Sequence, residues 1–291
     1  MQPVLFDVFS FPIPSYGLML ALSFLVGIWL ASWRAGKMGL NSNLMADVGF
    51  YVIISAIVGS RLYYVFLHYD KFRGNIVNIF NPFQDGSVGI DGLVMYGGVI
   101  GAIIAAVLFF KIKKAPFLPY ADAAAPSLGI GIFLTRIGCF LNGCCYGAAV
   151  VAERLFSVSY PHNNSPAGSY QAYVNAHALE PSQIYESVGG LVMALIVLAA
   201  GRMKTFAGFQ FYLAGLLYSV LRFFVDYSRV YTESEYLGPF THNQVICIVF
   251  FILFGTLILK KALKNNSVDE QNNEATTVDA DEQAKVAVDQ N

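Results

Sequence analysis

Charged residues are scarce in this sequence. Lys, Arg, Asp and Glu make up 13% of the 291 residues, and 56% of the residues are hydrophobic. An average soluble domain has about 25% charged residues, because it has to cover its surface with polar groups. The composition therefore excludes an ordinary soluble fold and predicts a protein whose surface faces lipid.

Two further features are missing. No long run of basic residues is present, and no basic patch is interleaved with aromatic residues, so nucleic acid is excluded as a partner. The N-terminus lacks the basic region and the small-residue cleavage site of a signal peptide. We therefore expect residues 1–14 to be retained.

The sequence does contain long apolar stretches, each close to the ~20 residues that cross a hydrocarbon core ~30 Å thick. They are apolar throughout rather than alternating with polar residues, which favours helices over a β-barrel. The sequence predicts an all-α integral membrane protein with seven transmembrane helices, over residues 16–33, 48–67, 93–110, 117–140, 183–201, 208–227 and 243–259.

The connections between these stretches differ in their basic residues. One set contains Arg34, Lys37, Lys111, Lys113, Lys114, Arg202, Lys204, Lys260, Lys261 and Lys264. The other set contains only Lys71, Arg73, Arg154 and Arg229. Because basic loops stay on the cytoplasmic side, we expect the N-terminus to lie outside and the C-terminus to lie in the cytoplasm.

The rest of the chain divides into a tail and two long connections. Residues 1–264 are predicted to form the seven-helix domain, and residues 265–291 an acidic, disordered cytoplasmic tail that holds 7 of the 19 acidic residues. Two outer connections, residues 69–92 and 141–182, are rich in Pro, Gly, Asn and aromatic residues without helical periodicity. We expect these connections to form a small extracytoplasmic cap over the bundle.

Three arginines lie inside the predicted helices. Arg61, Arg136 and Arg222 fall late in the second, fourth and sixth helices, which all run from inside to outside in the predicted topology. A single arginine near a helix C-terminus often extends to the membrane interface and implies no function. Three in one layer favour a site for a phosphate-bearing lipid headgroup, because guanidinium binds phosphate oxygens bidentately and stays charged.

Other polar side chains are predicted at the same depth. They are Tyr16, Tyr96 with Gly97 and Gly98 after it, Asn142, Gln183, Glu186 and Asp226. Taken singly, a tyrosine at an interface is usually an anchor, and a glutamate in a first helical turn usually complements the helix dipole. The two glycines allow either close helix packing or the close approach of a substrate. Together these residues predict a polar layer that faces the three arginines.

Three of the four cysteines lie close together in the sequence just after Arg136. Cys139, Cys144 and Cys145 allow a disulfide in an oxidising compartment, a metal site or plain packing. Three thiols without a nearby histidine are a weak signal for zinc, so no metal and no cofactor are predicted. Cys247, alone in the seventh predicted helix, is expected to be a packing residue.

The order of these segments resembles the bacterial prolipoprotein diacylglyceryl transferase family. The family signature, approximately GRxGNFxNxExxG, is similar to residues 135–147, with matches at Arg136, Gly138, Phe140, Asn142 and Gly147. Further matching segments are SYGL with Tyr16, GSRLYY with Arg61, YGG with Tyr96, PSQIYE with Gln183 and Glu186, RFFVDYSR with Arg222 and Arg229, and HNQ with Gln244. The resemblance covers nearly the whole chain except the acidic tail.

This resemblance implies transfer of the diacylglyceryl group from phosphatidylglycerol to the lipobox cysteine of a prolipoprotein, at the outer leaflet of the bacterial inner membrane. A thiol has to become a thiolate to attack carbon, and the departing phosphate has to be stabilised as its charge grows. On the family's pattern, Arg136 and Arg222 hold the phosphate, and Tyr16 and Asn142 position the headgroup. The other candidates are Glu186 and Tyr96 for catalysis, and Arg61, Gly97, Gly98, Gly147, Gln183, Asp226, Arg229 and Gln244 for substrate binding.

The sequence also departs from the family's pattern. Many members have His-Gly-Gly where this chain has Tyr96, and that histidine is a candidate base, whereas a phenol is a weak base at neutral pH. The signature Asn and Glu are replaced by Cys139 and Cys144, and a histidine before the PSQ segment by Glu180. Glu186, an ionised Tyr96 or no protein base at all stay open as the means of activating the thiol.

Two other classes of function fit parts of the pattern. A membrane thiol-disulfide oxidoreductase would use the three clustered cysteines, but it would ordinarily have a C-x-x-C pair. A small-anion transporter would place its charges at mid-membrane in broken helices, whereas these charges are predicted in the outer half. The three arginines and the order of the motifs favour the transferase.

Overall fold

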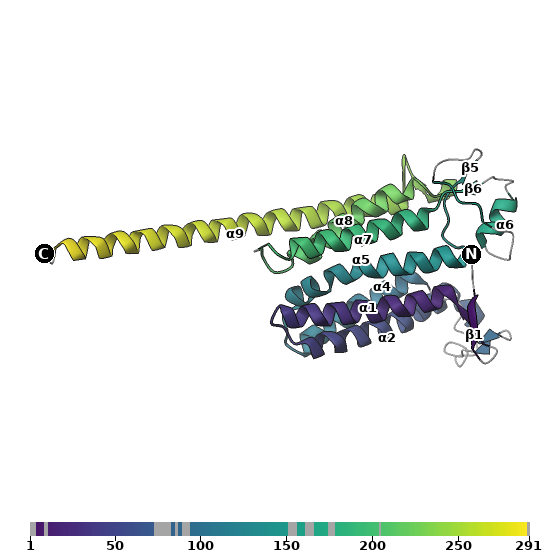
Figure 1. Cartoon of the computed structure of the whole chain (residues 1–291), viewed down its shortest axis with the longest axis horizontal. Coiled ribbons are helices and arrows are strands. Elements are labelled where there is room, and N and C mark those ends of the chain that lie inside the picture. Colours follow the sequence, from purple (N-terminus) through teal and green to yellow (C-terminus); the bar gives the residue numbers. More distant parts are fainter. Residues whose placement is uncertain are drawn as a thin grey trace.

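The computed structural model describes residues 4–8, 11–72, 83–84, 87–88, 94–150, 156–160, 166–173, 178–203 and 205–289. Within these ranges, long helices run side by side and short strands gather mainly at one end of them (Figure 1). The long helices are α1 (Ser15–Lys37), α2 (Ser42–Leu67), α4 (Met95–Ile112), α5 (Phe117–Asn142), α7 (Ser182–Ala200), α8 (Phe209–Asp226) and α9 (His242–Asp289).

Each predicted span overlaps one of these helices, and residue 93, where the third predicted span begins, lies outside the described residues. Five helical segments are long and apolar enough to cross a membrane, judged by length and composition: α1, α2, α5, α7 and the part of α9 from His242 to Asn265. The apolar part of α4, Tyr96–Ile112, is shorter. The fold is thus that of an all-α integral membrane protein, as predicted, and the count of seven spans stays a prediction.

Helix α5 occupies the centre of the bundle. It packs against α1 on one side and against α7 and α8 on the other, while α2 pairs with α4 and α8 pairs with α9. Successive helices alternate in direction, so α2, α5 and α8 end where α1, α4, α7 and α9 begin. We call this the ribbon end, because β1, β5, β6 and α6 lie there, and the opposite end, where α1 stops at Lys37, the tail end (Figure 1).

Local sequence signals set the bounds of two helices that shape the site. At the tail end, the Asn41 side chain accepts hydrogen bonds from the backbone N–H groups of Asn43 and Leu44 at 3.0 and 3.1 Å, which is a typical N-cap for α2. At the ribbon end, α5 stops at Gly143, whose φ of 71° lies in the left-handed region that glycine adopts without strain. The chain therefore turns sharply just after Asn142.

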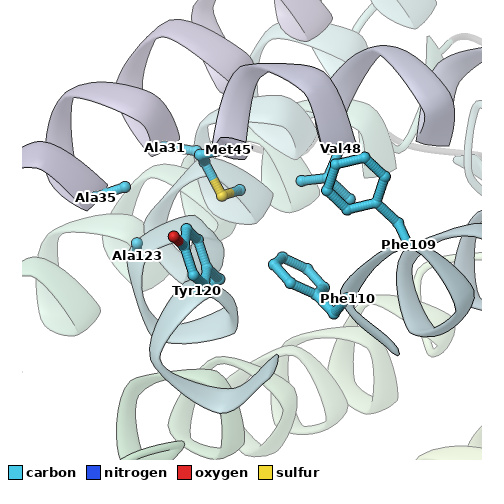
Figure 2. Close-up of a cluster of buried hydrophobic side chains, with 8 residues drawn as sticks. All are labelled: Ala31, Ala35, Met45, Val48, Phe109, Phe110, Tyr120 and Ala123. Atoms are coloured by element: carbon cyan, nitrogen blue, oxygen red, sulfur yellow. The ribbon is translucent and has the colours of Figure 1, made fainter. Parts of the chain in front are cut away.

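A hydrophobic core fastens α1, α2, α4 and α5 together near the tail end. It consists of Ala31, Ala35, Met45, Val48, Phe109, Phe110, Tyr120 and Ala123, whose side chains converge from these helices (Figure 2). The Tyr120 hydroxyl at its edge accepts a hydrogen bond from the Asn41 backbone N–H at 3.1 Å. Burying large apolar side chains of this kind contributes about 1.5–3 kcal/mol each, so the four helices are held firmly at this end.

Short elements follow or precede the long helices. They are α3 (Tyr69–Phe72), α6 (Pro166–Tyr173), the 3-10 helix η2 (Glu233–Glu235) and the strands β1 (Val4–Val8), β2 (Phe11–Pro14), β3 (Phe83–Gln84), β4 (Ser87–Val88), β5 (Ala149–Val150), β6 (Ala178–Leu179), β7 (Tyr236–Leu237) and β8 (Phe240–Thr241). The strands form antiparallel two-stranded ribbons, β1 with β2, β3 with β4, β5 with β6 and β7 with β8.

The second long connection carries a small core of its own. Tyr160, Ala167 and Leu179 are buried together, and Phe140 and Tyr146 pack against them. The second connection thus has a core of its own, and its extracytoplasmic position stays a prediction. Residues 151–155, 161–165 and 174–177 of this connection, and most of residues 73–93 in the first, lie outside the described residues.

Helix α9 continues past the apolar segment to Asp289 and projects beyond the bundle at the tail end (Figure 1). Its last part is the acid-rich segment for which the sequence predicts a disordered tail. Disorder of that segment stays a prediction.

Candidate active site

The Glu186 carboxylate is the centre of a buried ionic cluster at the ribbon end. Glu186 lies in the first turns of α7 and is only 1% exposed. Its Oε1 accepts a hydrogen bond from Arg136 Nη2 at 2.9 Å, and its Oε2 accepts one from Arg229 Nη2 at 3.1 Å. Arg222 Nη1 lies 3.8 Å from the same Oε2. Three guanidinium groups, from α5, α8 and the chain after α8, thus surround one carboxylate.

Asp226 extends this cluster by one turn of α8. Its Oδ1 lies 3.0 Å from Arg222 Nη2, an i,i+4 ion pair, and also accepts a hydrogen bond from the Tyr231 hydroxyl. Its Oδ2 accepts a hydrogen bond from the Thr241 hydroxyl. Burial, together with the hydrogen bond donated to Asp226, raises the pKa of Tyr231, so this phenol stays protonated.

Among the described residues, the cluster contains more positive than negative charge. Arg136, Arg222 and Arg229 face two carboxylates, those of Glu186 and Asp226. Within the described residues, the buried Arg222 Nη1 and Arg229 Nε have no hydrogen-bond partner. Unpaired buried donors are costly, and guanidinium donors fit the oxygens of a phosphate. The arrangement can therefore take up an anion.

A cavity of about 740 Å³ lies beside the cluster, between α1, α2 and α5. Its walls are mostly apolar, with Leu20, Phe24 and Val52 among them, and it reaches Ala31 and Met45 of the core near the tail end. At the ribbon end its lining becomes polar: Tyr16, Arg136, Cys139, Asn142, Cys144, Cys145, Glu186 and Tyr218. An apolar chamber that ends at a basic cluster matches an amphiphile with an anionic headgroup.

The three cysteines after Arg136 come together at this polar end. Their sulfur atoms all lie within 4.8 Å of one another, Cys139 being buried and Cys145 exposed. Hydrogen bonds from the Cys139 and Cys144 thiols, followed by the charges of Arg136 and Arg229, lower the pKa of the Cys145 thiol. The described cysteines are free rather than disulfide-bonded.

Several residues predicted from the sequence meet in this region. Arg136, Arg222, Arg229, Glu186 and Asp226 form the ionic cluster, and Tyr16 and Asn142 line the cavity.

Gln183 and Gln244 form hydrogen bonds with residues next to the site. Gln183 is fully buried, and its Nε2 donates to the Cys144 carbonyl oxygen at 2.8 Å. Gln244 Oε1 accepts a hydrogen bond from the Thr241 backbone N–H at 3.0 Å, and Thr241 Oγ1 accepts one from the Gln244 backbone N–H at 3.1 Å. Gly147 fixes the loop after α5, since its backbone N–H donates to the Glu180 carbonyl oxygen at 2.8 Å.

Arg61 lies elsewhere at the ribbon end, on the α2–α4 pair. It is 2% exposed, and its guanidinium Cζ lies 5.5 Å from the ring centroid of Tyr64 and 5.3 Å from that of Phe72. It is not among the residues that line the cavity. The third arginine around Glu186 is Arg229, a residue that the sequence placed in an outer loop.

Tyr96 and the two glycines after it also lie away from the cavity. The Tyr96 side chain is 54% exposed on α4. A Cβ on Gly97 would lie 2.3 Å from the Gly59 carbonyl oxygen, and one on Gly98 would lie 2.5 Å from Ser60 Oγ, both on α2. The sequence allows either close helix packing or the close approach of a substrate at these glycines, and their contacts with α2 are those of helix packing.

Sequence reasoning missed three polar side chains of the site. Tyr231 and Thr241 bind Asp226, and Tyr218 lines the cavity. The spacing of Tyr218, four residues before Arg222, is a signal that could have found it, because such residues share a helix face. No local pattern points to Thr241, which reaches Asp226 only through the fold.

Comparison with known proteins agrees with this geometry. Residues 3–260 match the model of the family described as prolipoprotein diacylglyceryl transferase. A phosphatidylglycerol–prolipoprotein diacylglyceryl transferase of Clostridium novyi (strain NT) is 31% identical over 271 residues, which are 93% of this chain and 100% of that protein. Proteins of the same name from Listeria innocua and Bacillus cytotoxicus are each 29% identical, over 91% and 84% of this chain and 92% and 86% of their own lengths. These similarities do not favour an oxidoreductase or a transporter.

Proposed function

Since the chain belongs to the prolipoprotein diacylglyceryl transferase family, we propose that it transfers the diacylglyceryl group of phosphatidylglycerol to the lipobox cysteine of prolipoproteins. The product carries a thioether, and glycerol phosphate leaves. This reaction is the first step of bacterial lipoprotein maturation. The partners are thus phosphatidylglycerol, prolipoprotein signal peptides with a lipobox, and the surrounding membrane lipid.

One observation carries this proposal: an apolar cavity that ends at a cluster of three arginines and two carboxylates. Acyl chains fit the apolar walls, and a phosphodiester fits the guanidinium group of Arg136, which lines the polar end of the cavity, with Arg222 and Arg229 packed beside the same carboxylate. Guanidinium groups next to the phosphate would also stabilise the charge that grows when it departs, which is how electrostatic stabilisation accelerates a reaction.

The reaction needs one bond to form and one to break. The lipobox sulfur, as a thiolate, attacks the diacylglyceryl carbon that bears the phosphate ester. A carbon–sulfur bond forms, the carbon–oxygen bond breaks, and the electron pair goes to the phosphate oxygen. Arg136 and Arg222 bind that phosphate, with Arg229 beside them. Tyr16 and Asn142 contact the headgroup from the cavity wall.

Glu186 and Asp226 act as positioning residues in this scheme. Glu186 accepts hydrogen bonds from both Arg136 and Arg229, and Asp226 pairs with Arg222. Paired carboxylates of this kind fix flexible side chains in one orientation before the ligand arrives, which lowers the entropic cost of binding. Both carboxylates are engaged by arginines, so neither is placed as a free base.

The proposal includes the topology predicted from the basic loops. Seven helices cross the inner membrane with the N-terminus outside, so the ribbon end faces the outer leaflet, where lipobox peptides arrive. Residues 1–264 are the catalytic unit, and the acidic segment from residue 265 is a disordered cytoplasmic tail. The excess of Lys and Arg in the connections at the tail end supports this orientation.

The test uses the purified protein in vesicles that contain phosphatidylglycerol and a lipobox peptide. Mass spectrometry should detect a peptide that has gained a diacylglyceryl group. Arg136→Ala and Arg222→Ala should each slow transfer by about 100-fold or more, because each removes a donor to the developing phosphate charge. Arg202→Ala, which removes an exposed arginine at the opposite end, is the control and should transfer at the wild-type rate.

Transfer at the wild-type rate in both site variants would contradict the role of the arginine cluster. Failure of the wild-type protein to transfer any diacylglyceryl group would contradict the proposed activity itself.

A further inference from the structure

The loop after α5 brings three thiols to one point. Gly143 has a φ of 71° and Cys145 a φ of 61°, a left-handed conformation that is rare for a residue with a Cβ. The two turns fold the loop back, so that the thiols of Cys144 and Cys145 meet that of Cys139 on the helix. Backbone conformations of this kind persist where surrounding contacts hold them, and they concentrate at functional sites.

Neighbouring groups hold the thiols in place. Gln183 Nε2 donates to the Cys144 carbonyl oxygen at 2.8 Å, and the Cys144 thiol donates to the Cys139 carbonyl oxygen at 3.7 Å. Arg136 Nη1 donates to Cys139 Sγ at 3.8 Å. The cluster is therefore preorganised, and a cation faces it on the side of the ionic cluster.

The spacing of the sulfur atoms fits one metal ion. Zinc binds thiolate sulfur at about 2.3 Å, which sets three sulfurs around one ion about 4 Å apart. The three Sγ atoms lie within 4.8 Å of one another, so only a small inward movement is needed. Thiolates select zinc and cuprous copper over magnesium or calcium. Three protein ligands and an open fourth position are typical of catalytic zinc rather than structural zinc.

The fourth position faces the cavity. All three cysteines line it together with Arg136 and Asn142. The described lining contains no histidine, and its one carboxylate, that of Glu186, already accepts hydrogen bonds from two arginines. The proposed reaction therefore lacks an evident acceptor for the proton of the substrate thiol. A thiol that coordinates a metal ion loses its proton outright.

We propose that Cys139, Cys144 and Cys145 bind one zinc ion, and that the lipobox cysteine binds as its fourth ligand and is thereby activated. The inference rests on the proposed transferase function. The proton of the substrate thiol passes to water, and the zinc-bound sulfur attacks the diacylglyceryl carbon. The carbon–oxygen electron pair leaves with the phosphate, next to Arg136 and Arg222. Zinc keeps its oxidation state, and the uncharged thioether, a weaker ligand than thiolate, leaves the ion.

The experiment measures zinc in the purified full-length chain. The protein is incubated with zinc sulfate, desalted and examined by elemental mass spectrometry and zinc X-ray absorption. We expect about one zinc ion per chain with three sulfur ligands, and a fourth sulfur when lipobox peptide is added. Cys145→Ser should lose most of the zinc; because Cys145 is exposed, this variant should keep the melting temperature of the zinc-free wild type. Cys247→Ser, at the buried cysteine of α9, is the matched control and should keep the zinc.

Equal zinc content in the wild type and Cys145→Ser would overturn the metal site, and so would a disulfide among the three cysteines in place of bound zinc. An unchanged sulfur count after peptide addition would overturn the role of the fourth ligand. The two proposals also fail separately. Full transfer by chelator-treated, zinc-free protein would overturn the zinc proposal and leave the transferase standing. Zinc and peptide binding without any transfer would support the metal site and contradict the transferase.

Discussion

The two ends of the bundle bury polar side chains in different ways. At the tail end, Asp122 of α5 is 4% exposed and accepts hydrogen bonds from the backbone N–H groups of Gly208 and Phe211, at 2.6 and 2.9 Å. Arg34 of α1 donates from Nη2 to Gln210 Oε1 at 2.6 Å. One carboxylate is thus matched with the N-terminus of α8 and with one buried arginine nearby, whose Nη1 has no hydrogen-bond partner among the described residues.

At the ribbon end, three arginines share two carboxylates, and the cluster opens on a cavity of about 740 Å³. Arg136 and Glu186 of the cluster line that cavity, whereas neither Asp122 nor Arg34 of the tail end does. The comparison teaches that a buried charge alone does not mark a site in this protein. A site is marked by an excess of charge of one sign next to a cavity, because a ligand in the cavity can then pair with the charges that the protein leaves unpaired.

The largest contrast between the two ends should come from Glu186→Gln. Loss of the charge leaves Arg136 and Arg229 without their carboxylate partner and Arg222 with Asp226 alone, and breaking a buried ion pair costs about 3–5 kcal/mol of stability. The arginines would also lose their shared orientation, so we expect transfer to slow by about 100-fold. Vesicle transfer assays and thermal unfolding in detergent measure the two effects.

Glu233→Gln is the control for this variant, because Glu233 is an exposed carboxylate at the same end. It should change neither transfer nor stability. A wild-type transfer rate in Glu186→Gln would show that Glu186 does not position the arginines.

Asp122→Ala should separate stability from activity at the other end. The change leaves the Gly208 and Phe211 amides without their acceptor, and an unsatisfied buried donor costs about 1–3 kcal/mol. We expect a lower melting temperature but an unchanged transfer rate per folded molecule. Asp122→Asn keeps one carbonyl acceptor and should recover part of the lost stability. A transfer defect in Asp122→Ala at temperatures where the protein is fully folded would count against the division between the two ends.

Gly97→Ala tests whether a predicted site glycine acts through packing. The new Cβ would lie 2.3 Å from the Gly59 carbonyl oxygen, so α2 and α4 would have to move apart. Overpacking of this kind costs about 1–3 kcal/mol. We expect a lower melting temperature, with transfer reduced only in proportion to the folded fraction. Gly255→Ala is the control, because its Cβ would meet Leu216 Cδ1 at an ordinary 3.8 Å. A selective loss of transfer in Gly97→Ala would instead favour substrate contact.

Much of this fold follows from the sequence because long apolar runs mark helices directly. The prediction over residues 117–140 corresponds to α5, Phe117–Asn142, and the others lie similarly on their helices. The depth of a residue in the membrane can also be predicted, because counting residues from a helix end gives its position along the helix axis. The common layer of Arg136, Arg222 and Glu186 follows from that count.

The lateral order of the helices does not follow from such counting. The sequence predicts Arg61 in one layer with Arg136 and Arg222, but α2 pairs with α4, and Arg61 contacts Tyr64 and Phe72 there. The sequence predicts Arg34 as a cation of a connection between helices, yet it is buried against Gln210 of α8. Both outcomes depend on which helices touch, and an apolar helix surface carries little information about its partner.

The sequence also does not predict that the three thiols come together. Their spacing allowed a disulfide, a metal site or packing, and the choice depends on the backbone of residues 143–145. Glycine at position 143 is a known signal for a helix end. A positive φ at Cys145 has no signal in its residue type, because surrounding contacts impose it.

The smallest effect should come from Tyr96→Phe. The Tyr96 side chain is 54% exposed on α4 and lies outside the cavity lining, whereas the polar residues of the site line that cavity or pack behind it. Removing a hydroxyl that touches neither the arginines nor the thiols should change transfer by less than about twofold, since surface substitutions usually shift free energies by at most ~0.5 kcal/mol. The vesicle assay, run over a range of pH, measures the rate.

Because Tyr96 occupies the position of a candidate base in the family pattern, a loss of about 100-fold would return Tyr96 to the reaction, with its phenolate oxygen as the proton acceptor. Such a loss would also remove the need for zinc to activate the thiol, so this variant decides between the two explanations.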